Sequence, residues 1–82
     1  MIRFTKHARE KFSVLRRHGV YLSRKQVIET VRKPDVIDRS RHPLLIAQCA
    51  VDATHVLRVV YKQSGDDQIV ITFYPGRLKQ YG

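Results

Sequence analysis

The chain has 82 residues, which allows one compact domain with a modest core and excludes anything larger. Hydrophobic residues make up 43% of it and charged residues 28%, a composition typical of globular rather than disordered proteins. The formal net charge of +9, from sixteen Lys and Arg against seven Asp and Glu, favours polyanions over neutral metabolites as partners.

The positive charge is concentrated in the amino-terminal third of the chain. Residues 1–33 contain ten cations and two acids, a net +8, whereas residues 34–82 contain six and five, a net +1. We therefore expect nucleic acid or an acidic protein as the partner. The alternative is that the charge serves solubility alone.

The amino terminus and the single cysteine bear on the cellular compartment. The stretch MIRFTKHAREKF carries charges where a signal peptide would be apolar, and no apolar run approaches the roughly 18 residues of a membrane helix. Cys49 cannot form an internal disulfide, and its position in LLIAQCAV predicts a small buried thiol. We expect a cytoplasmic protein with no membrane association.

A short strand and a helix are predicted first. IRFT, residues 2–5, can form the strand, after which Thr5 can cap a helix that ends at His18-Gly19. At 100° per residue one side of this helix is apolar. The other side carries the cations Lys6, Arg9, Arg16 and Arg17.

The second helix has a stronger start signal. Ser23 followed by Gln26 makes a capping box, and Pro34 ends the helix. After Pro34 the apolar period changes to two, which predicts a meander of strands over residues 35–39, 44–52, 54–63 and 68–75. The expected fold is one α+β domain over residues 1–82, with two helices packed on a curved antiparallel sheet of four or five strands, in the order β-α-α-β-β-β-β.

The loop between the last two strands is predicted to have three residues, Gly65-Asp66-Asp67. An odd number is required if two apolar sets are both to face the helices. These sets are Leu57, Val59 and Tyr61 on one strand and Ile69, Ile71 and Phe73 on the next. The opposite face then carries Arg58, Lys62, Thr72 and Tyr74.

Arg58 is notable because an arginine in mid-strand is costly to bury without a partner. Its guanidinium must reach water, a carboxylate or a phosphate. An ion pair with Asp38 or Asp52 and a functional role in binding phosphate are both open at this point.

The chain closes with ITFYPGRLKQYG, which places two cations and two phenols within residues 74–82. Pro75-Gly76 is predicted to bend the chain, so that the cations Arg77 and Lys79 grip phosphates. Tyr81 can then stack on an unpaired base. The alternative is that these residues are solvated charges and packing aromatics.

Several features of the chain occur together in one toxin superfamily. They are KHAREKF on the first helix, HGV after it, a second helix capped by Ser, PDVID, and the final VITFYPGRLKQY. The chain resembles the RelE/ParE-like toxins, a group of metal-independent endoribonuclease folds, and most of all a bacterial branch whose first helix bears His-Ala. The resemblance covers nearly the whole chain. Several members of the superfamily are gyrase poisons rather than nucleases.

The resemblance implies a toxin-like ribonuclease that works on messenger RNA, often at the ribosome, and is neutralised by a small acidic antitoxin protein. By correspondence with the RNA-cutting members, the catalytic residues would be Arg58, Arg77, Lys79 and Tyr81. His7 matches a position of the His-Ala branch alone.

The residues can also be matched to the chemistry directly. Cutting RNA without a metal requires that the 2′-hydroxyl lose a proton, the 5′-oxygen gain one, and the extra phosphate charge be stabilised. Arginine suits the last task, and His7, His55 or an activated Tyr or Lys can carry protons. His55, at the start of a strand, is expected to be incidental. We expect RNA to be bound by Lys6, Arg9, Arg16, Arg17 and Tyr74.

Other kinds of site find little support. The lone Cys and the scattered His lack paired-ligand spacings such as C-x-x-C, so we expect no metal and no cofactor. FSVLRRHGVYLSRKQVIETVRK can be read as a helix-turn-helix whose second helix, led by Arg24, Lys25 and Gln26, reads duplex DNA. The usual third helix is absent, and both apolar helix faces are needed to cover the sheet. The other rival is a non-catalytic basic adaptor for an acidic partner.

Overall fold

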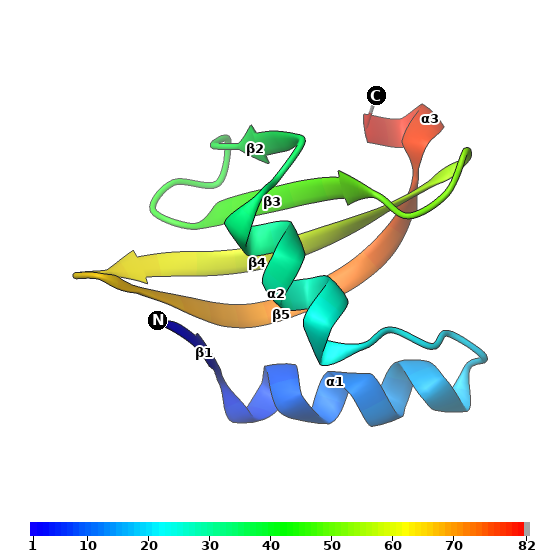
Figure 1. Cartoon of the computed structure of the whole chain (residues 1–82), viewed down its shortest axis with the longest axis horizontal. Helices are drawn as coiled ribbons and strands as arrows, with labels where there is room; N and C mark the ends of the chain where they lie inside the picture. Colours follow the sequence, from blue (N-terminus) through cyan, green and yellow to red (C-terminus); the bar gives the residue numbers. More distant parts are fainter. Residues whose placement is uncertain (82) are drawn as a thin grey trace.

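The secondary structure follows the predicted order of elements (Figure 1). The computed structural model describes residues 1–81. Its elements are β1 (Ile2–Phe4), α1 (Lys6–Arg17), α2 (Arg24–Arg32), β2 (Val36–Asp38), β3 (Leu45–Ala50), β4 (His55–Ser64), β5 (Asp67–Arg77) and α3 (Leu78–Tyr81). The α+β class and the β-α-α-β-β-β-β order are confirmed, and a single helical turn, α3, is added at the end.

The five strands form one sheet in the order β1-β5-β4-β3-β2. β2 to β5 are the predicted antiparallel meander. β1 pairs parallel with β5, so the sheet is mixed rather than wholly antiparallel. Parallel neighbours need a long connection between them. Here that connection includes both helices and the rest of the meander.

Both helices begin where their caps predict. The Thr5 hydroxyl accepts a hydrogen bond from the Ala8 amide at 3.1 Å, and the capping box of Ser23 and Gln26 is complete. After α1, Gly19 adopts a positive φ of 79°, which suits a helix end. No helix within residues 1–81 is long and apolar enough to cross a membrane.

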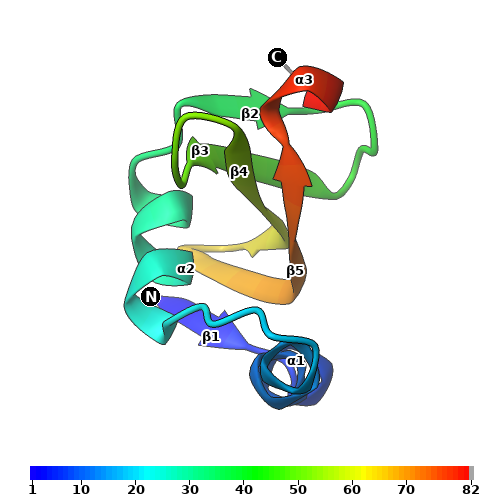
Figure 2. The ribbon, with the colours of Figure 1, turned by 90° about the vertical axis from the view of Figure 1, so that its right-hand side faces the viewer.

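The two long helices cover one face of the sheet. α1 packs on β5 and β1, while α2 packs on β4 and β3. Figures 1 and 2 place α1 and α3 on opposite sides of the molecule. The core between the helices and the sheet consists of Phe4, Ala8, Val27, Val31, Ala47, Leu57, Val59, Tyr61, Val70 and Phe73.

The turn between β4 and β5 is shorter than predicted. The expected three-residue loop ending at Asp67 is wrong, because Ser64 pairs with Asp67 and leaves only Gly65 and Asp66 in the loop. Gly65 has a φ of 60°, in the left-handed region that favours glycine. Asp67 belongs to the strand, where its carboxylate pairs with Arg3 of β1 at 3.2 Å.

A β-bulge supplies the odd residue that the loop was expected to provide. Val60 pairs with Thr72, but Tyr61 pairs with Val70, which leaves Ile71 as the extra residue of β5. Val70 is therefore fully buried in the core, whereas Ile71 is half-buried.

The predicted core set on β5 is corrected accordingly. Of Ile69, Ile71 and Phe73, only Phe73 is fully buried, and Val70 takes the remaining core position. The extra residue shifts the alternation of side chains by one position. Val70 therefore faces the core, where a strand without the bulge would place Ile69 and Ile71.

The bulge can be tested by two truncations in adjacent positions. Val70→Ala should lower the free energy of unfolding by about 2 kcal/mol, since it removes two fully buried carbons and leaves a cavity. Ile71→Ala removes three carbons but should cost less. Urea unfolding measures both, and a larger loss for Ile71→Ala would show that the register is the one predicted without a bulge.

Candidate functional site

Arg58 is buried in the sheet face opposite α1 and α2. Its neighbours Leu57 and Val59 belong to the helix-facing core, so alternation points Arg58 to the other side. The residue is only 5% exposed. Of the two open alternatives for its ion pair, the partner is Asp38 of β2, at 2.9 Å, and not Asp52.

Each of the three guanidinium nitrogens donates a hydrogen bond to a different strand. Nη1 donates to Gln48 of β3 at 2.6 Å, Nη2 to Asp38 at 2.9 Å, and Nε to the Tyr74 hydroxyl of β5 at 3.1 Å. Arg58 on β4 therefore links four strands. Three of the five N–H groups of its guanidinium are engaged by the protein itself.

The network holds both ionic partners in their charged forms. Burial opposes the charge on Arg58, but the hydrogen bonds to Tyr74 and Asp38 outweigh it, and the pKa of Arg58 is raised. The pKa of Asp38 is lowered to about 2 by hydrogen bonds from Ser40 and by the bond to Arg58. The pair is thus ionised throughout the physiological range.

The ring of Tyr81, in α3, covers the outer face of this guanidinium. The Cζ atom of Arg58 lies 4.0 Å from the ring centroid, a cation–π distance. Gly76 makes room for the ring, since a Cβ built on it would lie 2.5 Å from Cε2 of Tyr81. Tyr81 and Arg58 therefore lie together, but the tyrosine ring stacks on the guanidinium itself.

The predicted bend at Pro75-Gly76 is wrong. Both residues lie within β5, which pairs with β4 as far as Arg77. β1 pairs only with residues 68–70 of β5. At Pro75 that edge of β5 has no neighbouring strand, so a residue without a backbone N–H is tolerated there. The chain leaves the strand after Arg77, and the role of Gly76 is to accept the close approach of a ring.

A second group of polar residues surrounds a cavity of about 570 Å³ at the start of β4 and the end of β5. His55 and Arg77 are register partners there. The cavity is lined by Ala53, Thr54, His55, Arg77, Leu78 and Lys79.

Asp52 fixes the orientation of the His55 ring. Its Oδ1 lies 3.0 Å from Nδ1 of His55 and also accepts the His55 and Thr54 backbone amides, each at 2.8 Å. The pKa of Asp52 is lowered to about 2, chiefly by the Thr54 amide and then by His55. Nδ1 also lies 2.9 Å from the Thr54 hydroxyl, which can itself donate to Asp52 Oδ1 at 3.2 Å. A carboxylate can only accept, so the contact with Asp52 favours the tautomer that carries its proton on Nδ1, and in that tautomer Nε2 can accept a proton.

The sequence alone does not single out this pair. His55 is there one of several candidate proton carriers and is expected to be incidental, while Asp52 is only a candidate partner of Arg58. The signal is local: an Asp two and three residues before a Thr-His pair can accept both backbone amides in a turn, which brings the two side chains together.

The remaining predicted residues fall into separate groups. Arg77 pairs with His55, three residues from Arg58 along β4, so alternation directs Arg58 and Arg77 to opposite faces. The expectation that both face one phosphate is therefore wrong. His7 is exposed in α1, and this helix lies on the opposite side of the molecule from α3. The cations Lys6, Arg9, Arg16 and Arg17 are also exposed on α1.

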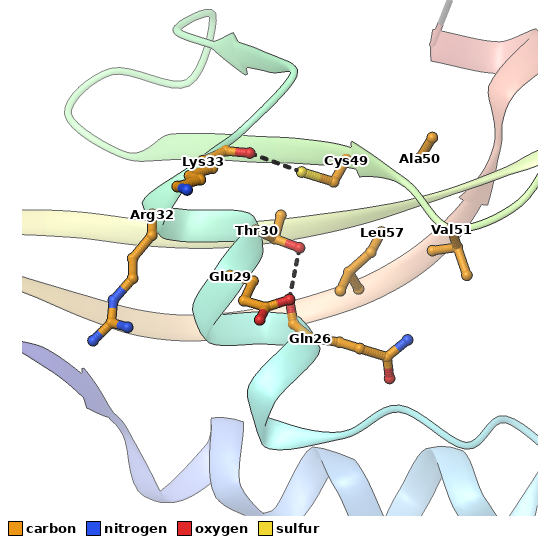
Figure 3. A pocket seen from close by; sticks show the side chains of 9 residues that line it. All are labelled: Gln26, Glu29, Thr30, Arg32, Lys33, Cys49, Ala50, Val51 and Leu57. Carbon is orange, nitrogen blue, oxygen red and sulfur yellow. Dashed lines mark hydrogen bonds between the residues drawn. The ribbon is translucent and has the colours of Figure 1, made fainter.

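A larger cavity, of about 620 Å³, lies between α2 and the end of β3 (Figure 3). Cys49 lines it and is half-buried rather than buried, so the prediction of a buried thiol is corrected. Its Sγ donates to the Lys33 carbonyl at 3.2 Å, and the Thr30 hydroxyl donates to the Gln26 carbonyl at 2.8 Å. The Cys49 thiol and the Thr30 hydroxyl are therefore bonded to backbone carbonyls. The larger cavity also has charged lining residues, but only the smaller cavity is lined by a histidine.

Known proteins give no further guide to this site. No family model, curated protein or solved structure matches the chain. The resemblance to RelE/ParE-like toxins therefore stays a prediction. Within residues 1–81, no group of three or more His, Cys, Asp or Glu is arranged to hold a metal ion.

The Asp38–Arg58 pair predicts a pH-dependent stability difference. Asp38→Asn should lower the free energy of unfolding at neutral pH, because it removes the carboxylate that neutralises a buried cation. The folded-state pKa of Asp38, about 2, lies below its ordinary value. Its contribution is therefore complete above about pH 4 and is lost as the pH falls through about 2.

Urea unfolding of wild type and Asp38→Asn, across the range from neutral pH to about pH 2, measures this difference. Glu10→Gln, which alters an exposed acid on α1, is the matched control and should change little. A stability gap for Asp38→Asn that stays constant down to the acid limit would contradict the ion-pair account.

Proposed function

We propose that the protein is a metal-independent endoribonuclease that acts on single-stranded RNA. The observation that carries the proposal is that His55, held by Asp52, shares a cavity with Arg77 and Lys79. An imidazole with a free Nε2 beside two cations meets the requirements of RNA cleavage: a base, a stabiliser of phosphate charge, and a proton donor.

In this proposal His55 Nε2 removes the proton from the 2′-hydroxyl, and the 2′-oxygen attacks the adjacent phosphorus. Arg77 stabilises the added negative charge with its planar donors. The bond to the 5′-oxygen breaks, and Lys79 supplies the proton that this oxygen takes up. The products are a 2′,3′-cyclic phosphate and a 5′-hydroxyl. Asp52 stabilises the imidazolium that forms on His55.

The distribution of charge supports RNA as the substrate. The net charge is +9, and α1 exposes Lys6, Arg9, Arg16 and Arg17. These cations lie on the side of the molecule away from α3, so in this proposal they hold flanking RNA rather than the scissile phosphate. Tyr74 is half-buried and its hydroxyl is bonded to Arg58, which makes it a support for the network.

The biological setting is part of the same proposal. The resemblance to RelE/ParE-like toxins supports a cytoplasmic toxin that acts on messenger RNA at the ribosome. The excess of positive charge supports a small acidic antitoxin protein as its partner.

Duplex DNA is a poorer fit than RNA. At the start of α2, the guanidinium of Arg24 lies over the Phe4 ring at 4.5 Å, and the Gln26 side chain closes the capping box. Two of the three side chains that would have to reach base edges are thus used within the fold. The other alternative is a non-catalytic adaptor, and a measurement of RNA cleavage distinguishes it from a ribonuclease.

Substitutions in the cavity should slow the chemical step. His55→Ala and Arg77→Ala should each lower single-turnover cleavage of a short RNA by about 10²-fold or more, the typical loss of a general base or of a charge-stabilising donor. Arg77→Lys should rescue poorly, because a point charge does not reproduce a two-pronged contact. Cleavage is measured at saturating protein in EDTA, in free solution and on ribosomes.

The matched control is His18→Ala, which removes the same side chain from an exposed position at the end of α1 and should leave the rate unchanged. Wild-type protein that cleaves no RNA in either setting would support the adaptor instead. Equal losses in all variants would show that the cavity has no special role.

The α1 cations should govern affinity and its salt dependence. Arg16→Ala and Arg17→Ala should weaken single-stranded RNA binding and reduce the log–log salt slope by about 0.7 for each phosphate that is no longer neutralised. Fluorescence anisotropy over a range of salt concentrations measures the slope. Ser13→Ala, on the same exposed face, is the control. An RNA affinity that does not change with salt concentration would rule out this electrostatic role.

A further inference from the structure

The edge of the Arg58 guanidinium is unsuited to binding phosphate. Three of its five N–H groups, one on each nitrogen, already donate to Asp38, Gln48 and Tyr74, at distances between 2.6 and 3.1 Å. Phosphate recognition by arginine uses these same donors. A phosphate would have to compete with these bonds in a side chain that is only 5% exposed. An aromatic ring can instead cover the flat outer face of Arg58 without breaking any of the three bonds, as the Tyr81 ring does.

That face is covered at present by a ring on a small, exposed element. α3 is a single turn of four residues, Leu78–Tyr81, and it packs on β5. Tyr81 remains 41% exposed even though its ring lies 4.0 Å from Cζ of Arg58. The contact rests on one cation–π interaction and on the hollow above Gly76, so a competing ring has little to displace.

We propose that the outer face of Arg58 is a stacking site for an unpaired nucleobase, and that the Tyr81 ring occupies this site until the base displaces it. The inference rests on the proposed function for its ligand, single-stranded RNA. Every base presents a flat π face, and guanidinium planes are established stacking partners for bases. Arg58 is held rigid by four strands, so the platform needs no reorganisation.

The same short helix connects this platform to the His55 cavity. Leu78 and Lys79 line the cavity, while Tyr81, two residues later, covers Arg58. A base that moves Tyr81 therefore also moves the segment that carries Lys79. In this way, binding of a base at the outer face of Arg58 is coupled to the position of Lys79 in the His55 cavity.

The test compares two RNA probes and three variants by fluorescence anisotropy. The probes are a six-nucleotide oligo(A) and a six-unit abasic ribose-phosphate chain, which has the same phosphates and no bases. Tyr81→Ala removes the covering ring and should bind oligo(A) about three- to tenfold more tightly than wild type. The abasic chain should bind both proteins equally. Tyr81→Phe keeps the ring and should behave as wild type.

Gly76→Ala gives an independent route to the open site, because it keeps the phenol but leaves no room for the ring. It should shift oligo(A) affinity in the same direction as Tyr81→Ala. In the NMR spectrum of wild type, the Arg58 Nε–H resonance should move on addition of oligo(A) and stay in place with the abasic chain. This resonance is a direct probe, since its hydrogen bond to Tyr74 fixes it beside the platform.

The contrary outcomes are distinct. Weaker oligo(A) binding by Tyr81→Ala would show that Tyr81 itself stacks on the base, and unchanged binding would show that Arg58 is no platform. In both cases salt-dependent RNA binding by wild type would leave the proposed function intact. Failure of wild type and all variants to bind either probe would overturn the stacking site and the proposed function together.

Discussion

The hydrogen bonds of the buried Arg58 side chain are the interaction on which the outer half of the sheet depends. An unpaired cation at this position would cost several kcal/mol in desolvation, so its partners must be correctly placed for the fold to form. β2 has only three residues, and Val36 at its start is 54% exposed. β2 pairs with β3 along all three residues, and the bond from Arg58 to Asp38 adds a side-chain link from this edge strand to β4.

That structural role separates two kinds of arginine at the end of the chain. Three of the five N–H donors of Arg58 bond within the protein and its outer face lies against the Tyr81 ring, whereas Arg77 is exposed and lines a cavity beside His55. The resemblance to a toxin superfamily placed both in one catalytic set. The register of β4 and β5 instead assigns them to opposite faces, and α3 lies between the two with Tyr81 on one and Lys79 on the other.

The sequence predicted those features that depend on local chemistry. Thr5 and Ser23 marked the helix starts because capping is decided within four residues, and alternation marked the meander. It missed the bulge at Ile71 and the parallel pairing of β1, since both depend on contacts between distant segments. The pairing of Asp52 with His55 was local and readable, but nothing in the sequence showed that Arg77 and Lys79 would close around it.

The central claim is that the imidazole of His55, beside Arg77, contacts the RNA, and that the imidazole of His7 on α1 does not. The most direct measurement is an NMR titration of the histidine side chains with a short RNA that carries a 2′-deoxy nucleotide at the cleavage position, so that binding proceeds without reaction. The account predicts that the ring resonances of His55 move most, while those of His7 stay close to their free positions. A dominant shift at His7, with His55 unmoved, would contradict it.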